Sequence, residues 1–263
     1  MQGGAEASDA CGKPRPPCLT SQGPVLTIAQ MPSALRIYRG DPTKGRDQVM
    51  PDQQDDAARF EALYHVPSEA PWTWPEPHPL VVQLVAQHKI PPGRVLEVGC
   101  GEGYHAIYLA SQGCTVVAID RSRTAIQHAQ AHARAAKVAI EWRVMAAQDL
   151  HRMDWQFDWV FDWRFCHELT DEEERRAYVR DVARVLVPGG KYLSAAFSGE
   201  SPYWGSGTLR TTPNTQAVLY FARWEDLQRL YAPYFTVLER HALTVRDKPD
   251  FQVPAYCLVL EKM

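Results

Sequence analysis

The sequence lacks any apolar run long enough to cross a membrane. Its apolar stretches, such as LVVQLVAQ and TVVAI, are far shorter than the roughly 18 to 20 residues that span a bilayer. It also lacks a basic start followed by an apolar core, so we expect no secretion signal. The six cysteines form no C-x-x-C pair, which favours buried reduced thiols over disulfides or metal ligands. These features predict a cytoplasmic protein with no membrane partner and no metal.

A basic excess is also missing. The chain has 28 Lys+Arg against 31 Asp+Glu, a formal charge of −3, with the 45% hydrophobic content of an ordinary globular protein. Proteins that bind nucleic acid normally carry a basic stripe, so we expect no nucleic-acid partner. The composition leaves open whether the protein is a monomer or a homodimer.

Aromatic residues are scarce at the N-terminus. Residues 1–57 contain seven prolines, one aromatic residue, and no sustained helical or strand periodicity. A segment with so little to bury cannot offset its ordering entropy, so we expect a disordered tail over 1–57 and a folded domain over 58–263. Helical spacing begins at Ala58, and a second helical run over residues 80–89 follows Pro79.

After Gly93 the chain alternates short β-rich runs with helical ones, which indicates a mostly parallel sheet covered by helices. The expected strands are Arg94–Val98, Thr115–Ile119, Ile140–Val144, Trp159–Phe161, Lys191–Phe197, Phe235–Glu239 and Tyr256–Leu260. The expected helices lie near Tyr104–Ser111, Thr124–Ala136, Asp171–Leu186 and Glu225–Tyr231. Thr170 and Glu173 have capping-box spacing at the start of the third helix. The fold class is therefore α/β, with a doubly wound, seven-stranded sheet whose last strands pair antiparallel.

The most informative stretch is VLEVGCGEGY, a buried strand that breaks into alternating glycines before a helix. The dinucleotide fingerprint G-x-G-x-x-G would need glycine where Tyr104 stands. Glu97, two residues before Gly99, suits a ligand that presents an amino group and a positive charge. The next strand ends in Asp120, 17 residues after Gly103, where a carboxylate can accept hydrogen bonds from both hydroxyls of a ribose.

Together, E-x-G-x-G-x-G and a second-strand acid resemble the class I S-adenosylmethionine-dependent methyltransferases, and the resemblance runs from about Arg59 to Met263. It implies a Rossmann-like sheet of order 3-2-1-4-5-7-6 with the last strand antiparallel. It also implies S-adenosylmethionine as the cofactor, held across the carboxyl ends of strands 1 to 4. The implied cofactor-binding residues are Glu97, Gly99, Cys100, Gly101, Gly103, Asp120, Arg121, Ala147, Gln148, Asp162 and Trp74.

The chain departs from this family at the adenine site. Many members place an aspartate after the third strand to hold the adenine amino group, and the matching position here is Ala146. We therefore assign adenine recognition to Gln148 and the backbone of Ala147.

The segment after the fourth strand and the upstream residues Pro71–Pro79 resemble the small-molecule branch that contains thiopurine, halide/thiol and tellurite-resistance methyltransferases. This branch implies a lid over residues 58–90. Trp163 stands where the branch has arginine, and Arg164 follows it. The expected substrate-binding residues are Trp72, Arg164, Tyr203 and Trp204. A tryptophan near the sulfonium would add cation–π attraction, whereas Trp72 and Trp74 could equally anchor the N-terminal arm to the sheet.

Two residues after the fourth strand are candidate catalytic groups. His167 or Asp162 would serve as general base for a hydroxyl or amine acceptor, although His167 could instead be a neutral core histidine. His128 and His132 share a helical face, but no third ligand is evident, so we assign them to solvent.

We therefore expect methyl transfer to a small molecule, with a slight preference for a sulfur, selenium or tellurium nucleophile, which needs no strong base. The alternatives are an O- or N-methyltransferase that uses His167, and a non-catalytic module that binds S-adenosylmethionine.

Overall fold

The computed structural model describes residues 53–65, 70–213, 215–247 and 251–263. The predicted tail lies outside the described residues up to residue 52, and helix α1 begins at Gln53, ahead of the predicted domain boundary. None of the helices in these described ranges is long and apolar enough to cross a bilayer.

The described chain alternates helices and strands. The helices are α1 (Gln53–Leu63), α2 (Pro79–Ala86), α3 (Tyr104–Ser111), α4 (Arg123–Ala136), α5 (Glu172–Val185) and α6 (Trp224–Tyr231), with short 3-10 helices η3 (Ala147–Arg152) and η4 (Cys166–Glu168). The strands are β1 (Arg94–Val98), β2 (Thr115–Asp120), β3 (Glu141–Val144), β4 (Phe157–Trp163), β5 (Leu186–Phe197), β6 (Leu209–Thr211), β7 (Val218–Tyr220), β8 (Phe235–Asp247) and β9 (Phe251–Lys262).

One sheet organises the fold. Its seven strands run in the order β3-β2-β1-β4-β5-β9-β8, and β9 is antiparallel to both of its neighbours. When the strands of this sheet alone are counted, this is the predicted order 3-2-1-4-5-7-6. The numbering shifts because β6 and β7 form a separate hairpin, which the sequence did not predict.

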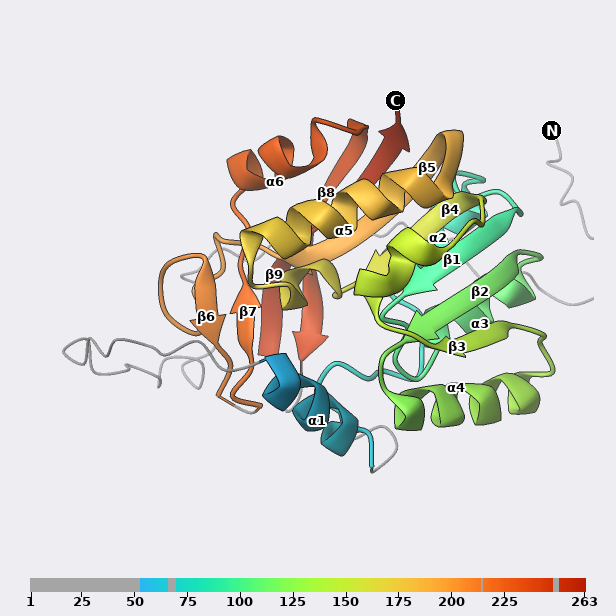
Figure 1. The fold of residues 1–263 in the computed structure, drawn as a ribbon, viewed down its shortest axis with the longest axis horizontal. Coiled ribbons are helices and arrows are strands. Elements are labelled where there is room, and N and C mark those ends of the chain that lie inside the picture. Colours follow the sequence, from blue (N-terminus) through green and yellow to red (C-terminus); the bar gives the residue numbers. More distant parts are fainter. Residues whose placement is uncertain (1–52, 66–69, 214, 248–250) are drawn as a thin grey trace, which may run out of the picture. The chain divides into compact units, whose positions relative to one another are not determined.

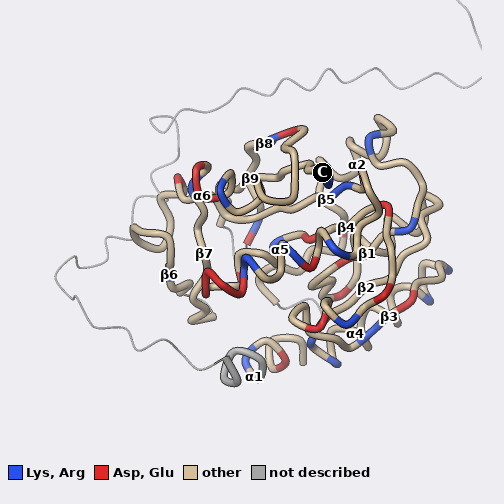
Figure 2. The backbone as a smooth tube through the Cα atoms, turned by 45° about the horizontal axis from the view of Figure 1, so that its top comes forward, with Lys and Arg blue, Asp and Glu red and all other residues tan. Residues whose placement is uncertain are grey.

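Helices cover both faces of the sheet because its strands are buried on both sides. Val81 of α2 and Leu109 of α3 share an apolar cluster with Val95, whereas Val179 of α5 shares another with Leu96. Neighbouring residues of β1 thus point to opposite faces, as the strand pleat requires. Figure 1 shows α5 lying across the near face. Acidic and basic residues both lie along α5, which begins with Glu172–Glu174 and carries arginines further on (Figure 2).

The parallel strands bring the carboxyl ends of β1, β2 and β4 to one edge. In doubly wound sheets the ligand crevice lies at this edge.

Candidate functional site

A cavity of about 690 Å³ opens at the carboxyl ends of β1, β2 and β4. Its remaining walls come from α1, from residues 72–79 before α2, and from the facing ends of β8 and β9. The volume is within the range of pockets that enclose small ligands and cofactors. Most of the sequence-predicted site residues line it.

The loop between β1 and α3 forms the floor of this cavity. Gly99 and Gly101 both have positive φ, 66° and 52°. A Cβ atom on Gly99 would lie 2.6 Å from Phe165 Cδ2, and one on Gly101 would lie 2.9 Å from Tyr64 Oη. Glycine is therefore required here both by backbone conformation and by the rings packed against the loop.

Asp120 connects the end of β2 to this loop. Its Oδ2 accepts a hydrogen bond from the Gly101 amide at 2.9 Å, and its Oδ1 accepts one from the Ser122 amide at 2.8 Å. Burial raises the pKa of this carboxyl, and the two amide bonds oppose that rise. The carboxylate is thus held in a fixed position at the cavity wall.

Glu97, at the end of β1, is the less satisfied acid. Burial raises its pKa to about 8, and its Oε2 has no hydrogen-bond partner among the described residues. The nearest histidine nitrogen, His105 Nδ1, lies 3.9 Å from Oε1. Burial lowers the pKa of His105 to about 3, and its Nε2 accepts a hydrogen bond from the His78 amide at 3.2 Å. A buried carboxyl with an unpartnered oxygen suits a ligand that brings an ammonium group.

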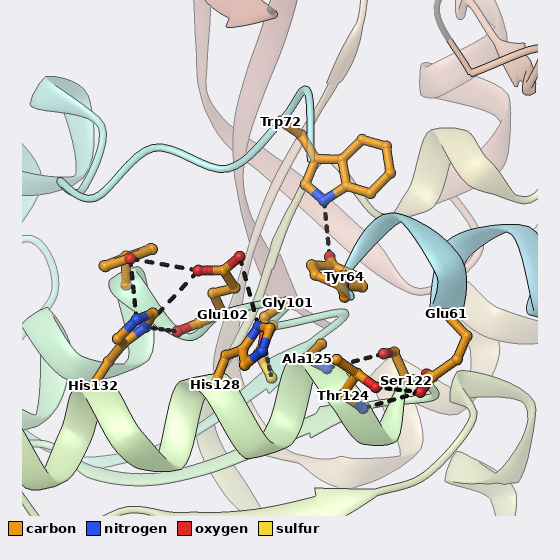
Figure 3. Close-up of polar contacts among 12 residues, drawn as sticks. Glu61, Tyr64, Trp72, Gly101, Glu102, Ser122, Thr124, Ala125, His128 and His132 are labelled. Carbon is orange, nitrogen blue, oxygen red and sulfur yellow. Dashed lines mark hydrogen bonds and ion pairs between the residues drawn. The ribbon is translucent and has the colours of Figure 1, made fainter. Parts of the chain in front are cut away.

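Hydrogen bonds hold α1 and the residue after it, Tyr64, beside the glycine loop (Figure 3). Glu61 Oε1 accepts hydrogen bonds from the Thr124 amide and hydroxyl at 3.3 and 2.5 Å, which joins α1 to α4. Trp72 Nε1 donates to Tyr64 Oη at 2.8 Å. The helix therefore covers the floor of the cavity.

The opposite wall joins three distant segments. Trp74 Nε1 donates to the Arg246 carbonyl at 3.2 Å, and Arg164 Nη1 donates to the same oxygen at 3.2 Å. Arg164 Nη2 also donates to Asp247 Oδ1 at 3.0 Å. The Arg246 carbonyl of β8 thus links residues 72–79 to the residue that follows β4, because it accepts hydrogen bonds from both.

Residues 95–190 match the family model described as a methyltransferase domain. This matched segment, residues 95–190, is a class I S-adenosylmethionine-dependent methyltransferase domain. The chain is 30% identical over 147 residues to the 2-heptyl-1-hydroxyquinolin-4(1H)-one methyltransferase of Mycobacteroides abscessus, covering 56% of this chain and 64% of that protein. It is 29% identical over 148 residues to a protein of Arabidopsis thaliana named probable thiol methyltransferase 2, covering 51% and 61%. The matched segments thus span less than two thirds of these relatives.

Solved structures agree on the fold of this methyltransferase domain. The N1-methyltransferase of 1,6-didemethyltoxoflavin from Burkholderia thailandensis superposes with a TM-score of 0.64 at 18% identity, covering 83% of this chain and 93% of that one. A solved structure from work on the conversion of a disulfide bond into a thioacetal group in echinomycin biosynthesis superposes with a TM-score of 0.63 at 25% identity. The match covers 77% of this chain and 90% of that one. The predicted fold class and family are confirmed.

The residues of the methyltransferase cavity fit S-adenosylmethionine. The unpartnered Glu97 oxygen suits the amino group, and Asp120 stands at the end of the second strand. The structure brings together the following predicted cofactor residues along one cavity: Glu97, Gly99, Cys100, Gly101, Gly103, Asp120, Arg121, Ala147, Gln148 and Trp74. Trp72 and Arg164, predicted for the substrate, line the same cavity.

Asp162 does not belong to the cavity lining, so the structure places it apart from the residues that share its predicted cofactor and catalytic roles. Its side chain is fully buried and accepts hydrogen bonds from the hydroxyls of Tyr178, Tyr192 and Ser194. Burial raises its pKa to about 6. With three hydroxyl donors, this carboxyl stabilises the packing of α5 and β5 against β4.

The predicted base His167 is also buried outside the cavity lining. It is 1% exposed, stacks 4.4 Å from the ring centroid of Phe197, and does not line the cavity. Its Nδ1 accepts a hydrogen bond from the Phe197 amide at 3.3 Å, and burial lowers its pKa. These contacts favour the alternative of a neutral core histidine, and the catalytic role of His167 stays a prediction.

Tyr203 and Trp204, predicted for the substrate, lie elsewhere as well. They pack with Phe197, Phe221 and Phe251 in an aromatic cluster beside the β6–β7 hairpin, outside the cavity lining. The loop after β5 turns toward Phe221 because these rings bury one another there.

His128 and His132 lie beside the glycine loop and are 20% and 29% exposed to solvent (Figure 3). Their Nδ1 atoms each lie 4.0 Å from a carboxylate oxygen of the buried Glu102, and His132 Nδ1 also lies 3.2 Å from the Glu102 carbonyl. Within the described ranges, no group of three His, Cys, Asp or Glu residues could hold a metal ion.

Several lining residues were not predicted individually. Tyr64, His78, His105, Trp163 and Arg246 come from separate elements. His78 and Trp163 lie in segments that the family resemblance had identified, and this resemblance was the only indication in the sequence that they face the cavity.

Proposed function

We propose that this protein transfers a methyl group from S-adenosylmethionine to a small-molecule acceptor whose nucleophilic atom ionises without an enzyme base. The observation that carries the proposal is the single cavity that joins the glycine loop, Asp120 and the unpartnered Glu97 oxygen to an aromatic wall. When bound, S-adenosylmethionine supplies an electrophilic methyl group on a positively charged sulfur.

The chain's residues would divide the work of holding the cofactor. Glu97 would bind the amino group, Asp120 would accept the ribose hydroxyls, and Gln148 with the Ala147 backbone would contact the adenine. The glycine loop would let the backbone approach the cofactor closely. Trp74 would cover the reaction site and exclude water from it.

Positioning would supply most of the catalysis. Holding two reactants in line is worth up to about 7 to 11 kcal/mol. Hydrogen bonds join α1 to α4, Tyr64 to Trp72, and Trp74 to the end of β8, and these bonds would hold the cavity walls in place for this.

The two histidines of the lining do not act as bases in this proposal. His78 Nδ1 accepts a hydrogen bond from the Leu80 amide, and His105 Nε2 accepts one from the His78 amide, both at 3.2 Å. A neutral imidazole that accepts at one nitrogen carries its proton on the other, so neither ring offers a second lone pair. This favours acceptors that arrive ionised, such as thiols and heavier chalcogens. One relative is named for a hydroxyquinolinone and another for thiols, so the preference for a particular nucleophilic element belongs to the proposal.

The test is cofactor turnover against a panel of thiols, selenols, phenols and alcohols at several pH values. We expect the rate to rise with the acceptor's own ionisation, because the thiolate is the nucleophile. His167→Gln should leave the shape of this profile unchanged. A profile that follows an enzyme group, together with a loss of about 10² to 10⁴-fold in the mutant, would contradict the proposal.

A further inference from the structure

One guanidinium in the cavity wall has an unused donor. Arg164 lines the cavity, and its side chain is only 8% exposed. Both terminal nitrogens have partners, namely the Arg246 carbonyl and Asp247, but Nε is buried without a hydrogen-bond partner among the described residues. A buried, unpaired donor on a charged group is costly, so this nitrogen indicates a ligand contact.

The protein holds this guanidinium in place from several directions. The backbone of Arg164 has a positive φ of 70°, and its amide donates to the Ala195 carbonyl at 2.8 Å. Its Cζ lies 4.7 Å from the ring centroid of Phe197. Because a non-glycine residue at positive φ is strained, the surrounding bonds determine where the guanidinium sits.

Flat rings form the wall around it. Trp74, His78, Trp163 and Phe165 line the cavity with Arg164. His78 and Trp163 lie 4.7 Å apart between centroids at 35°. Ring faces of this kind favour flat, aromatic ligands over flexible chains.

Acidic and basic side chains both line the cavity. Glu97, Glu102 and Asp120 belong to the glycine loop and the tip of β2, where they would repel an anion. Arg164 and Arg246 belong to the wall formed by β4 and β8, where Glu168 also lines the cavity and Asp247 pairs with Arg164 Nη2. It is therefore the unpartnered Nε of Arg164, and not the net charge of this wall, that can donate to an anionic ligand group.

We propose that the acceptor is a flat aromatic molecule carrying an anionic group, and that Arg164 Nε binds this group. The inference rests on the proposed function, because methyl transfer defines the acceptor. It makes Arg164 a specificity-determining residue that selects the acceptor by charge.

The test compares 2-naphthoate with uncharged 2-naphthamide by calorimetry on the full chain, with and without saturating S-adenosylhomocysteine. We expect naphthoate to bind about 10- to 100-fold more tightly, the range of one hydrogen bond to a charged group. Arg164→Gln should abolish this preference. Arg164→Gln leaves the buried carboxylate of Asp247 without its arginine partner, which could destabilise the fold. The double variant Arg164→Gln/Asp247→Asn removes that charge, so it should fold and should lose the naphthoate preference as well. Arg240→Gln is the control, because its guanidinium packs on Trp224 outside the cavity lining.

Two results would overturn the inference. One is a naphthoate preference that survives in both Arg164 variants. The other is a loss of S-adenosylhomocysteine affinity in these variants with the naphthoate preference intact, which would assign the guanidinium to the cofactor's carboxylate. Failure of S-adenosylhomocysteine to bind the unmodified chain would reject the proposed function, while the naphthoate comparison without it would still decide the role of Arg164.

Discussion

Two carboxyl groups at neighbouring strand tips, Asp120 and Glu97, differ in how many hydrogen bonds they already accept from the protein. Asp120 already accepts two backbone amides, whereas Glu97 keeps one oxygen without a partner in the described chain. Asp120 is thus a rigid acceptor, and Glu97 is a group whose charge depends on what binds beside it. The two acids therefore call for different experiments.

Asp120→Asn should weaken S-adenosylhomocysteine binding about 10- to 100-fold. The reason is the loss of a charged acceptor for the ribose hydroxyls, worth about 1.5 to 3 kcal/mol. Isothermal calorimetry measures the change. Asp158→Asn is the matched control, because Asp158 accepts the Arg94 amide at 2.7 Å at the other end of β1. Equal affinities in the two variants would argue against a cofactor role for Asp120.

Binding of S-adenosylhomocysteine at pH 7 should release close to one proton from Glu97. Its pKa of about 8, raised from 4.5 by burial, keeps the carboxyl protonated in the ligand-free protein. An ammonium group beside it favours the charged form and lowers the pKa. Calorimetry in buffers of different ionisation enthalpy counts the protons, and Glu97→Gln should release none. Proton release that persists in this variant would have to come from another group.

The same pKa shift affects stability in the ligand-free protein. Because the folded-state pKa is raised, Glu97 favours the folded state at pH below about 4.5, and this contribution is lost as the pH rises to about 8.

At the residue scale, the sequence could locate the strand tips but could not tell which side chains face the cavity. Asp162 lies one residue before the end of β4 and Asp120 ends β2, and the sequence treats both as ligand-facing. The difference comes from Tyr178 and Tyr192, whose hydroxyls reach Asp162 from distant parts of the chain. Such partners have no local signal.

At the element scale, the loop between β1 and α3 determines how closely a ligand can approach. Gly101→Ala should abolish most S-adenosylhomocysteine binding, because its Cβ would meet Tyr64 Oη and displace the amide that donates to Asp120. Gly189→Ala is the control: its φ is 71°, and nothing lies within 4 Å of the added Cβ. Both variants should lose about 1 to 2 kcal/mol of unfolding free energy from the left-handed backbone. Urea unfolding and calorimetry separate these effects, and equal loss of binding in both variants would count against the loop's role.

Elements bounded by strong local signals were predicted well. β1 and α3 match their expected ranges, because a short buried run ends in glycines and a helix follows. The cap of α5 was misplaced by one residue: Asp171 accepts the Glu174 amide in place of the predicted Thr170. The β6–β7 hairpin was missed because it is stabilised by distant rings, among them Phe197 and Phe251, and not by local periodicity.

At the scale of the whole molecule, the cavity depends on segments far apart in sequence. Residues 72–79 and the ends of β8 and β9 complete walls that begin on β1, β2 and β4. The sequence predicted the sheet order and the edge that carries the site. It could not predict that the Arg246 carbonyl would accept from both Trp74 and Arg164, because that contact exists only once β8 has paired with β9.

Two N-terminal deletions should separate the tail from the cavity cover. Removing residues 1–50 should leave the melting temperature and the S-adenosylhomocysteine affinity unchanged, because this segment has a single aromatic residue, Tyr38, and little else to bury.

Removing residues 1–65 also deletes Glu61 and Tyr64, which join α1 to α4 and to Trp72. That deletion should weaken binding and expose the glycine loop to solvent. Thermal unfolding and calorimetry on both chains decide the matter: a drop in melting temperature for the shorter deletion would mean that the tail contributes to the fold, and unchanged affinity in the longer one would mean that α1 does not cover the cofactor.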